Sequence, residues 1–379
     1  MQNKPKLRFK EFNDEWREDK LCNLFLINAG GDIDSSHCSS EKTEKFCYPI
    51  YANALTNNGL YGYSDIYKVK GHTITVTGRG DVGHATPRKE PYYPIVRLLI
   101  LRPQHNENVD FFASVINSTR IFLESTGVPQ LTSPQLSKVK VSYPSTQEQN
   151  RIAEVLNKVD EVIAEREEEV KDLEQQKKGL MQKIFSQQLR FTDSNNNPYP
   201  DWEDKKIGDV FEFYNGKAHE QEIDENGEYI VVNSKFISTE GQVKKYTNKV
   251  ICPLKKDDIV LVMSDVPNGK AMSKCYLIEE DNKYSLNQRI CCLRTKDVAR
   301  FFIYQISRNK YFLKFDNGVS QTNLRKEDVL KCPIQVPCLE EQQKIANVLS
   351  KLDELIEEKK ALLSDWQSFK KGLLQQMFV

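Results

Sequence analysis

The sequence predicts an α+β fold in which two mixed α/β domains are joined by two long antiparallel coiled-coil helices, with a pseudo-twofold internal repeat. Residues 144–185 match residues 337–378 at a constant offset of 193, without a gap, and nearly half of the positions are identical. Apolar residues in both copies alternate at spacings of four and three, which is typical of a coiled coil. We expect a first domain at 1–143, a first helix at 144–187, a second domain at 188–336 and a second helix at 337–379.

The composition is that of a globular protein, with 39% hydrophobic and 10% aromatic residues. No segment approaches the ~18 consecutive apolar residues of a membrane span, and the N-terminus lacks the apolar run of a signal peptide. We therefore expect a cytoplasmic protein without membrane contact. The nine cysteines include no Cys-x-x-Cys pair, which favours free buried thiols over a zinc site.

The formal net charge is zero, although phosphate binding needs clustered Lys and Arg side chains. The two domains carry net charges of +3 and +1, and the two helices carry −3 and −1. The helices are thus the acidic parts of the chain, which favours contact with protein over contact with nucleic acid.

Each helix is expected to bury a seam of residues at the alternating positions. In the first helix these are Ile152, Leu156, Val159, Ile163, Arg166, Val170, Leu173, Lys177, Leu180 and Ile184, and in the second Ile345, Leu349, Leu352, Ile356, Lys359, Leu363, Trp366, Lys370, Leu373 and Met377. The seam cations either fix the register of the pair or extend to water. Gly179 and Gly372 suggest a close approach of backbones, because glycine weakens a helix by roughly 1 kcal/mol.

Pro144 and Pro337 precede the helices, and Ser145 to Glu148 fit a capping box. A coiled coil of this kind often serves dimerisation between chains. Here the duplication favours pairing within one chain, because two equal helices separated by a domain can bury each other.

The two domains repeat more faintly than the helices. Leu7-Arg8-Phe9 and Trp16 recur as Leu189-Arg190-Phe191 and Trp202, and Gly127 to Gln130 resembles Gly318 to Gln321. Expected strands lie at 47–52, 73–77, 95–101, 228–233, 259–263 and 290–293, with helices at 111–117 and 298–307. The pair Phe111-Phe112 also recurs in the second half, as Phe301-Phe302.

Residues 78–83 read Gly-Arg-Gly-Asp-Val-Gly, which formally matches a dinucleotide-binding fingerprint. The fingerprint needs a following helix, and Pro87 and Pro91 argue against one. We favour a glycine-rich loop that lets Arg79, Arg88 and Lys89 approach phosphates or base edges, with a plain β-turn as the alternative. Residues 264–270 are its counterpart in the second domain.

Arginine pairs with guanine, and Asn and Gln pair with adenine, so polar loop residues are candidate base-reading residues. For each such residue taken alone, a turn residue is the favoured interpretation. The candidate DNA contacts are Asn53, Arg79, Arg88, Lys89, Gln130, Asn233, Lys235, Lys270, Gln321 and Asn323.

We expect no catalytic residue, cofactor or metal in this chain, because no paired-carboxylate, triad, nuclease or metal-ligand pattern is present. Asn197-Pro198-Tyr199-Pro200 has the wrong order for the Asn-Pro-Pro-Tyr motif of adenine methyltransferases. The alternatives to a DNA-reading protein are a DNA methyltransferase in its own right and a non-catalytic coiled-coil scaffold.

Together, the repeated openings, the segments before Pro144 and Pro337 and the helices ending in Lys-Lys-Gly-Leu resemble the specificity (S) subunits of type I restriction-modification systems. The resemblance implies a target recognition domain in each half, each reading one part of a bipartite sequence in double-stranded DNA, with the helices setting the gap. It also implies two modification subunits docked on the helices, and restriction subunits with translocase activity. S-adenosylmethionine, ATP and Mg are then expected on those partners.

Overall fold

The computed structural model describes residues 5–119, 130–219, 221–266, 269, 271–316 and 321–378. The chain divides into two compact units, Met1–Glu169 with Lys359–Val379, and Val170–Glu358. We call them unit 1 and unit 2. In the described part of the chain, no helix combines the length and the apolar character that crossing a membrane requires.

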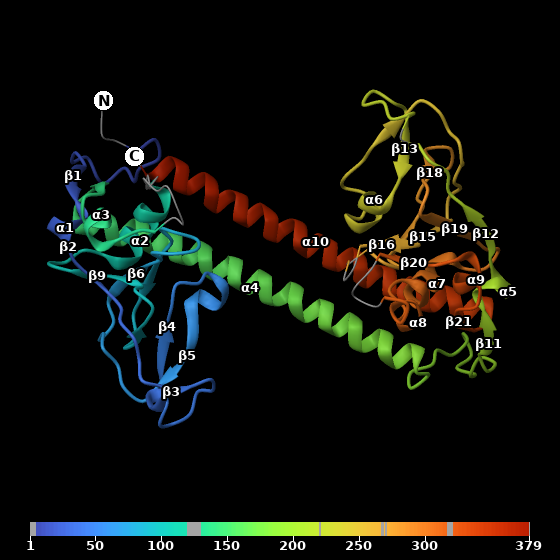
Figure 1. The fold of residues 1–379 in the computed structure, drawn as a ribbon, viewed down its shortest axis with the longest axis horizontal. Helices are drawn as coiled ribbons and strands as arrows, with labels where there is room; N and C mark the ends of the chain where they lie inside the picture. The colour runs from blue at the N-terminus through green and yellow to red at the C-terminus, as the bar shows by residue number, and fades with distance from the viewer. Residues whose placement is uncertain are drawn as a thin grey trace. The chain divides into compact units, whose positions relative to one another are not determined.

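Unit 1 combines short strands and helices with parts of the two long helices (Figure 1). Its elements are β1 (Arg17–Lys20), α1 (Leu21–Leu24), β2 (Phe25–Ala29), η1 (Ser35–His37), β3 (Cys38–Ser39), β4 (Tyr48–Tyr51), η2 (Thr56–Gly59), β5 (Leu60–Ser64), β6 (Thr73–Val76), β7 (Ala85–Arg88), β8 (Tyr93–Pro94), β9 (Leu99–Pro103), α2 (Val109–Ser118), α3 (Ser133–Ser137) and β10 (Lys140–Tyr143), followed by the start of α4 (Thr146–Phe185).

The main sheet of unit 1 has the order β2-β9-β6-β7, with antiparallel neighbours throughout. A second sheet, β3-β5-β4-β8, contains one parallel pair, and β1 pairs with β10. The core joins the main sheet to α2 and to both long helices, since Phe112, Leu156 and Met377 belong to one buried cluster.

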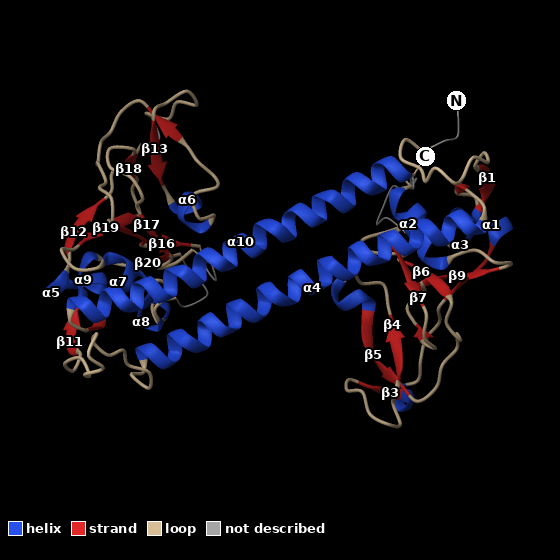
Figure 2. Ribbon diagram, turned by 180° about the vertical axis from the view of Figure 1, so that it is seen from behind, coloured by secondary structure: helices blue, strands red, loops and turns tan. Residues whose placement is uncertain are grey.

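Unit 2 has a similar order of elements around its main sheet, with differences in the smaller sheets and helices (Figure 2). Its elements are β11 (Glu203–Lys206), α5 (Ile207–Val210), β12 (Glu212–Asn215), β13 (Tyr229–Val232), α6 (Ser234–Ser238), β14 (Tyr246–Thr247), β15 (Ile259–Val262), β16 (Ser264–Asp265), β17 (Cys275–Leu277), β18 (Tyr284–Leu286), β19 (Ile290–Arg294), α7 (Ala299–Ile306), α8 (Lys310–Leu313), β20 (Thr322–Asn323), α9 (Lys326–Leu330) and β21 (Pro333–Val336), with the end of α4 and the start of α10 (Leu339–Met377).

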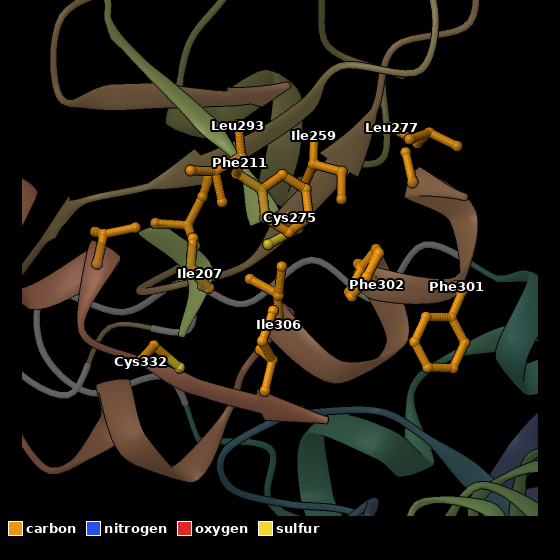
Figure 3. Close-up of a cluster of buried hydrophobic side chains, with 14 of the residues drawn as sticks. Ile207, Phe211, Ile259, Cys275, Leu277, Leu293, Phe301, Phe302, Ile306 and Cys332 are labelled. Atoms are coloured by element: carbon orange, nitrogen blue, oxygen red, sulfur yellow. The ribbon is translucent and has the colours of Figure 1, made fainter. Parts of the chain in front are cut away.

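The main sheet of unit 2, β12-β19-β15-β17, is again antiparallel. Smaller sheets are β14-β13-β18, β16-β20 and β11-β21. Figure 3 shows the core, where Phe211 and Phe302 lie among Ile259, Leu293 and Ile306. The rings of Phe211 and Phe302 meet edge to face at 5.1 Å, as those of Phe25 and Phe112 do in unit 1.

The two units share a backbone pattern that their sequences hide. The Gly30 amide donates to the carbonyl of Leu98 at 2.7 Å, and the Gly216 amide donates to that of Ile290 at 3.0 Å. Parallel bridges follow at once, from Gly31 to Ile95 and from Lys217 to Asn287. A Cβ on Gly30 or Gly216 would lie within 3.0 Å of the facing backbone, so both positions require glycine.

All ten seam positions of α4 and all ten of α10 are buried or half-buried. Ion pairs join the helices in antiparallel order, since Lys370 bonds to Asp160 and Lys359 to Glu169 within unit 1. Within unit 2, Lys177 bonds to Asp353. Three of the four seam cations are therefore paired across the helices rather than extended to water, which supports a role in register, whereas Arg166 pairs with Glu169 of its own helix.

Two sequence-based expectations about the helices were wrong, and the expectation of free buried thiols was correct only in part. Nothing lies within 4 Å of a Cβ built on Gly179 or Gly372, so neither glycine marks a close approach to described residues. The capping box at Ser145 does not form, because Arg8 and Trp16 bind the carboxylate of Glu148. All nine cysteines are free, but only four are buried.

The expected strand at 95–101 was also wrong in its first half. β9 begins only at Leu99, because Val96 and Arg97 adopt left-handed φ angles of 52° and 58° that end an extended run. The other expected strands and both expected short helices lie within two residues of the observed elements.

Candidate functional site

Each long helix is anchored to a domain through a buried glutamate in its first turn. In unit 1, the Arg8 guanidinium donates to both carboxylate oxygens of Glu148, at 2.7 and 2.8 Å. The Trp16 indole N–H approaches the same carboxylate at 3.4 Å. Glu148 is 1% exposed, so its charge depends on these donors.

Unit 2 repeats the anchor with equivalent residues. Arg190 donates to Glu341 at 2.9 and 3.0 Å, and the Trp202 indole donates at 2.9 Å. The hydrogen bond from Arg8 to Glu148 raises the pKa of Arg8, and the bond from Arg190 to Glu341 does the same for Arg190. The repeated Arg, Trp and Glu positions in the sequence were the signal for this contact.

The residue after the buried glutamate in each long helix is a buried glutamine. It holds the N-terminus of the neighbouring short helix, α2 in unit 1 and α7 in unit 2. Gln149 donates to the Pro144 carbonyl at 3.0 Å and accepts from the Asn108 amide, which precedes α2, at 3.1 Å. Gln342 makes the same two bonds to Pro337 and Val298, at 2.9 and 3.1 Å. The Glu-Gln pairs therefore hold each domain on its helix.

Of the candidate DNA contacts, Asn53 has a positioning role. Its side-chain oxygen accepts from the Gly78 amide at 2.7 Å, and its amide donates to the Val96 carbonyl. Asn53 thus joins the 78–83 loop to the turn that precedes β9. Both side-chain atoms of Asn53 therefore hold the loop in place, and its contact with DNA stays a prediction.

The 78–83 loop is the connection of the β6–β7 hairpin, and no helix follows it. Arg79 is exposed on this loop and donates to Gln130 at 3.5 Å. Arg79, Arg97 and Gln130 line a cavity of about 230 Å³. Two candidate contacts thus lie together, and the cavity adds Arg97, which sequence reasoning missed.

The equivalent place in unit 2 holds Ser264, Gln321 and Asn323. Ser264 and Asn323 are paired between β16 and β20, and Gln321 donates to both of their side chains, at 2.6 and 3.3 Å. The Leu131 amide bonds to the Gly78 carbonyl in unit 1, and the Leu324 amide bonds to Met263 in unit 2. Gln130 therefore corresponds to Asn323 rather than to Gln321.

Arg88 is not available for DNA. It is 7% exposed, with its guanidinium 3.5 Å from the centre of the Tyr51 ring. It donates to Thr75 Oγ1 at 2.9 Å and to the Asn58 carbonyl at 2.7 Å. Burial lowers its pKa. The structure therefore corrects the prediction that Arg88 contacts DNA. Arg88 is a buried structural residue of β7 that bonds to Thr75 of the neighbouring strand β6.

The remaining candidates are scattered. Lys89 is exposed and forms an ion pair with Asp110 at 3.2 Å. Asn233 caps α6 by accepting from the Phe236 amide, and its contact with a base stays a prediction; Lys235 is exposed on that helix. Lys270 lies outside the described residues, as do 127–129 and 318–320, on which part of the sequence repeat rests.

In the described ranges, no group of three His, Cys, Asp or Glu side chains could hold a metal ion. The Asn197 side chain donates to Asp193 at 3.1 Å, and the Pro200 carbonyl accepts from Arg190 at 2.7 Å, so the segment 197–200 is an ordered turn.

A basic cleft of about 690 Å³ in unit 1 contains Lys68, Lys70 and Arg102. The chemistry that these surfaces support is binding by exposed cations and amides.

The chain matches the profile of a known family over residues 13–175 and 199–364, and that family is described as the type I restriction modification DNA specificity domain. A type I specificity subunit of Mycoplasma pneumoniae is 29% identical over 144 residues, which are 38% of this chain and 40% of that protein. The specificity subunit of the type I restriction enzyme MjaVIII of Methanocaldococcus jannaschii is 27% identical over 274 residues, which are 66% and 64%. Each alignment spans less than two thirds of the relative.

The fold matches that of a solved type I restriction-modification S subunit from M. genitalium. The TM-score is 0.67 at 17% identity, and the superposition covers 99% of both chains. The profile matches once over each half of the chain, in agreement with the two repeated units. The chain belongs to the type I restriction-modification DNA specificity family.

Proposed function

We propose that the chain is a specificity subunit in which each unit reads one part of a bipartite sequence in double-stranded DNA, and the helices set the gap. One observation carries this proposal. Both units have a pair of polar residues at the same place in the same fold, but the residues differ, with exposed Arg79 and half-buried Gln130 in unit 1 and buried Ser264 and exposed Asn323 in unit 2. A shared frame with different donors and acceptors suits two different half-sites.

The chain contributes recognition, and chemistry is supplied by its partners. Two modification subunits, docked along α4 and α10, carry S-adenosylmethionine and methylate adenine, and restriction subunits carry ATP and Mg. The complex acts in the cytoplasm. The acidic character of the helices supports a protein-facing role for them.

Methylome sequencing tests this function in cells that express the chain with a modification subunit. We expect a split adenine-methylated motif, and exchange of residues 1–143 for the corresponding segment of another family member should change only one half of it. Changes in both halves, or an unsplit motif, would contradict the proposal. Methyl transfer by the purified chain alone would show instead that it is a methyltransferase.

A further inference from the structure

A tight turn that is common to both units carries an arginine at its tip. The matched contacts of Gly30 and Gly216 place Arg97 and Arg289 at the same point, one residue before Leu98 and Ile290. The turn leads directly into β9 in unit 1 and into β19 in unit 2. The two arginines are therefore structural equivalents.

Both arginines have a backbone conformation that is costly for any residue except glycine. The φ angle is 58° at Arg97 and 68° at Arg289, and such left-handed angles cost roughly 1 kcal/mol. Packing does not require the side chains, because both are exposed. Within the described ranges, neither guanidinium has a hydrogen bond or an ion pair. An arginine retained twice at a site that suits glycine points to a ligand.

The residues beside these turns are the differing polar pairs of the two units described above. Arg97 lines the same cavity as Arg79 and Gln130. The Arg289 carbonyl accepts from the Met263 amide at 2.9 Å, next to Ser264. The neighbours thus differ between the units, whereas the arginine is the same.

We propose that Arg97 and Arg289 bind backbone phosphates and hold each domain in register on its half-site, an inference that rests on the proposed function. Phosphates are identical at every sequence, so a residue common to both units suits them. Base edges differ between half-sites, so the variable neighbours suit base readout. The two arginines are positioning residues, and exchange of the domains would leave this contact unchanged.

The test compares the full chain with Arg97→Gly and Arg289→Gly variants, each bound to its modification subunit. Glycine removes the guanidinium and suits the left-handed turn, so the melting temperature should stay the same or rise. Binding is measured on a duplex that carries the methylated motif and on the same duplex with one half scrambled, over a series of salt concentrations. Arg17→Ala is the control, because it removes an exposed arginine from β1.

Each glycine variant should weaken binding to both duplexes by the same factor and reduce the salt slope by about one, with an unchanged methylation motif. Unchanged binding, or an equal loss in Arg17→Ala, would overturn the inference. A motif altered in one half would also overturn it, because the arginine would then read a base. If the unaltered complex does not distinguish the two duplexes, the proposed function itself fails.

Discussion

Lys177 of α4 forms an ion pair with Asp353 of α10, and Asp353 also accepts a hydrogen bond of 2.6 Å from the Tyr304 hydroxyl. The equivalent pair in unit 1 joins Lys370 to Asp160. Asp353 therefore links the two helices to α7, whereas no described tyrosine binds Asp160.

This difference predicts unequal costs for two matched substitutions. Asp160→Asn should lower the free energy of unfolding by about 0.5 kcal/mol, since it weakens one half-exposed ion pair. Asp353→Asn should cost about 1.5 kcal/mol, because it also weakens the bond from Tyr304. Urea denaturation measures both, and equal losses would mean that the Tyr304 bond contributes nothing.

Removing the charge of the buried glutamate at the start of either long helix should lower the free energy of unfolding further. Glu341→Gln leaves Arg190 without its buried carboxylate, so the free energy of unfolding should fall by about 3 kcal/mol. Glu148→Gln should give a similar loss through Arg8. Calorimetry on both variants checks this, with exposed Glu203→Gln as the control. If the free energy of unfolding falls no more than in the control, the buried Arg–Glu pairs do not stabilise the contact between each helix and its domain.

Acid should weaken the contact between the helices at Glu169. The hydrogen bond from Lys359, followed by that from Arg166, holds the pKa of Glu169 below its usual value. The folded state therefore binds the proton less readily than the unfolded state, whose pKa is about 4.3. The stability that Glu169 contributes should be present above that pH and lost as the pH falls through the lower folded pKa.

The measurement for Glu169 is the difference in urea midpoint between the unaltered protein and Glu169→Gln, from about pH 7 to about pH 3. We expect a difference near neutral pH that disappears in acid. A difference that is constant with pH would show that the ionised form of Glu169 has no special role.

Two arginines of the same hairpin should respond in opposite ways. Arg88→Met should cost about 2–3 kcal/mol, because it leaves buried acceptors at Thr75 and Asn58 unsatisfied. Arg79→Ala should leave the stability unchanged and alter DNA binding. Thermal denaturation and binding to the methylated motif separate the two effects. A stable Arg88→Met variant with weakened DNA binding would reverse the assignment.

The thiols should differ in their reactivity. Cys22 is exposed, whereas burial raises the pKa of Cys275, Cys291, Cys292 and Cys332, for Cys332 to about 12. A disulfide reagent at about pH 8 should modify Cys22 quickly and the four buried thiols only after unfolding. Cys22→Ser should remove the fast phase, and its persistence would place that reactivity at another cysteine.

Periodicity predicted the helices well, because burial along a coiled coil depends on local spacing. The sequence also showed Glu148 and Glu341 as repeated residues, but not their role, since their partners lie more than 130 residues away. Arg88 was misjudged because its burial depends on Tyr51, which approaches only in the folded chain. The arginine at 97 was missed because its neighbours Ile95, Leu98 and Leu99 fit a continuous strand.

The core of unit 1 is closed by the end of α10. The Leu7 amide bonds to the Gln376 carbonyl, and the Phe378 ring lies 5.6 Å from that of Phe111. The matching contacts of unit 2, from Leu189 to Lys183 and from Phe301 to Phe185, lie inside one continuous segment. On the ribosome, unit 1 must therefore wait for the end of α10 to be synthesised, and unit 2 can complete its core before unit 1.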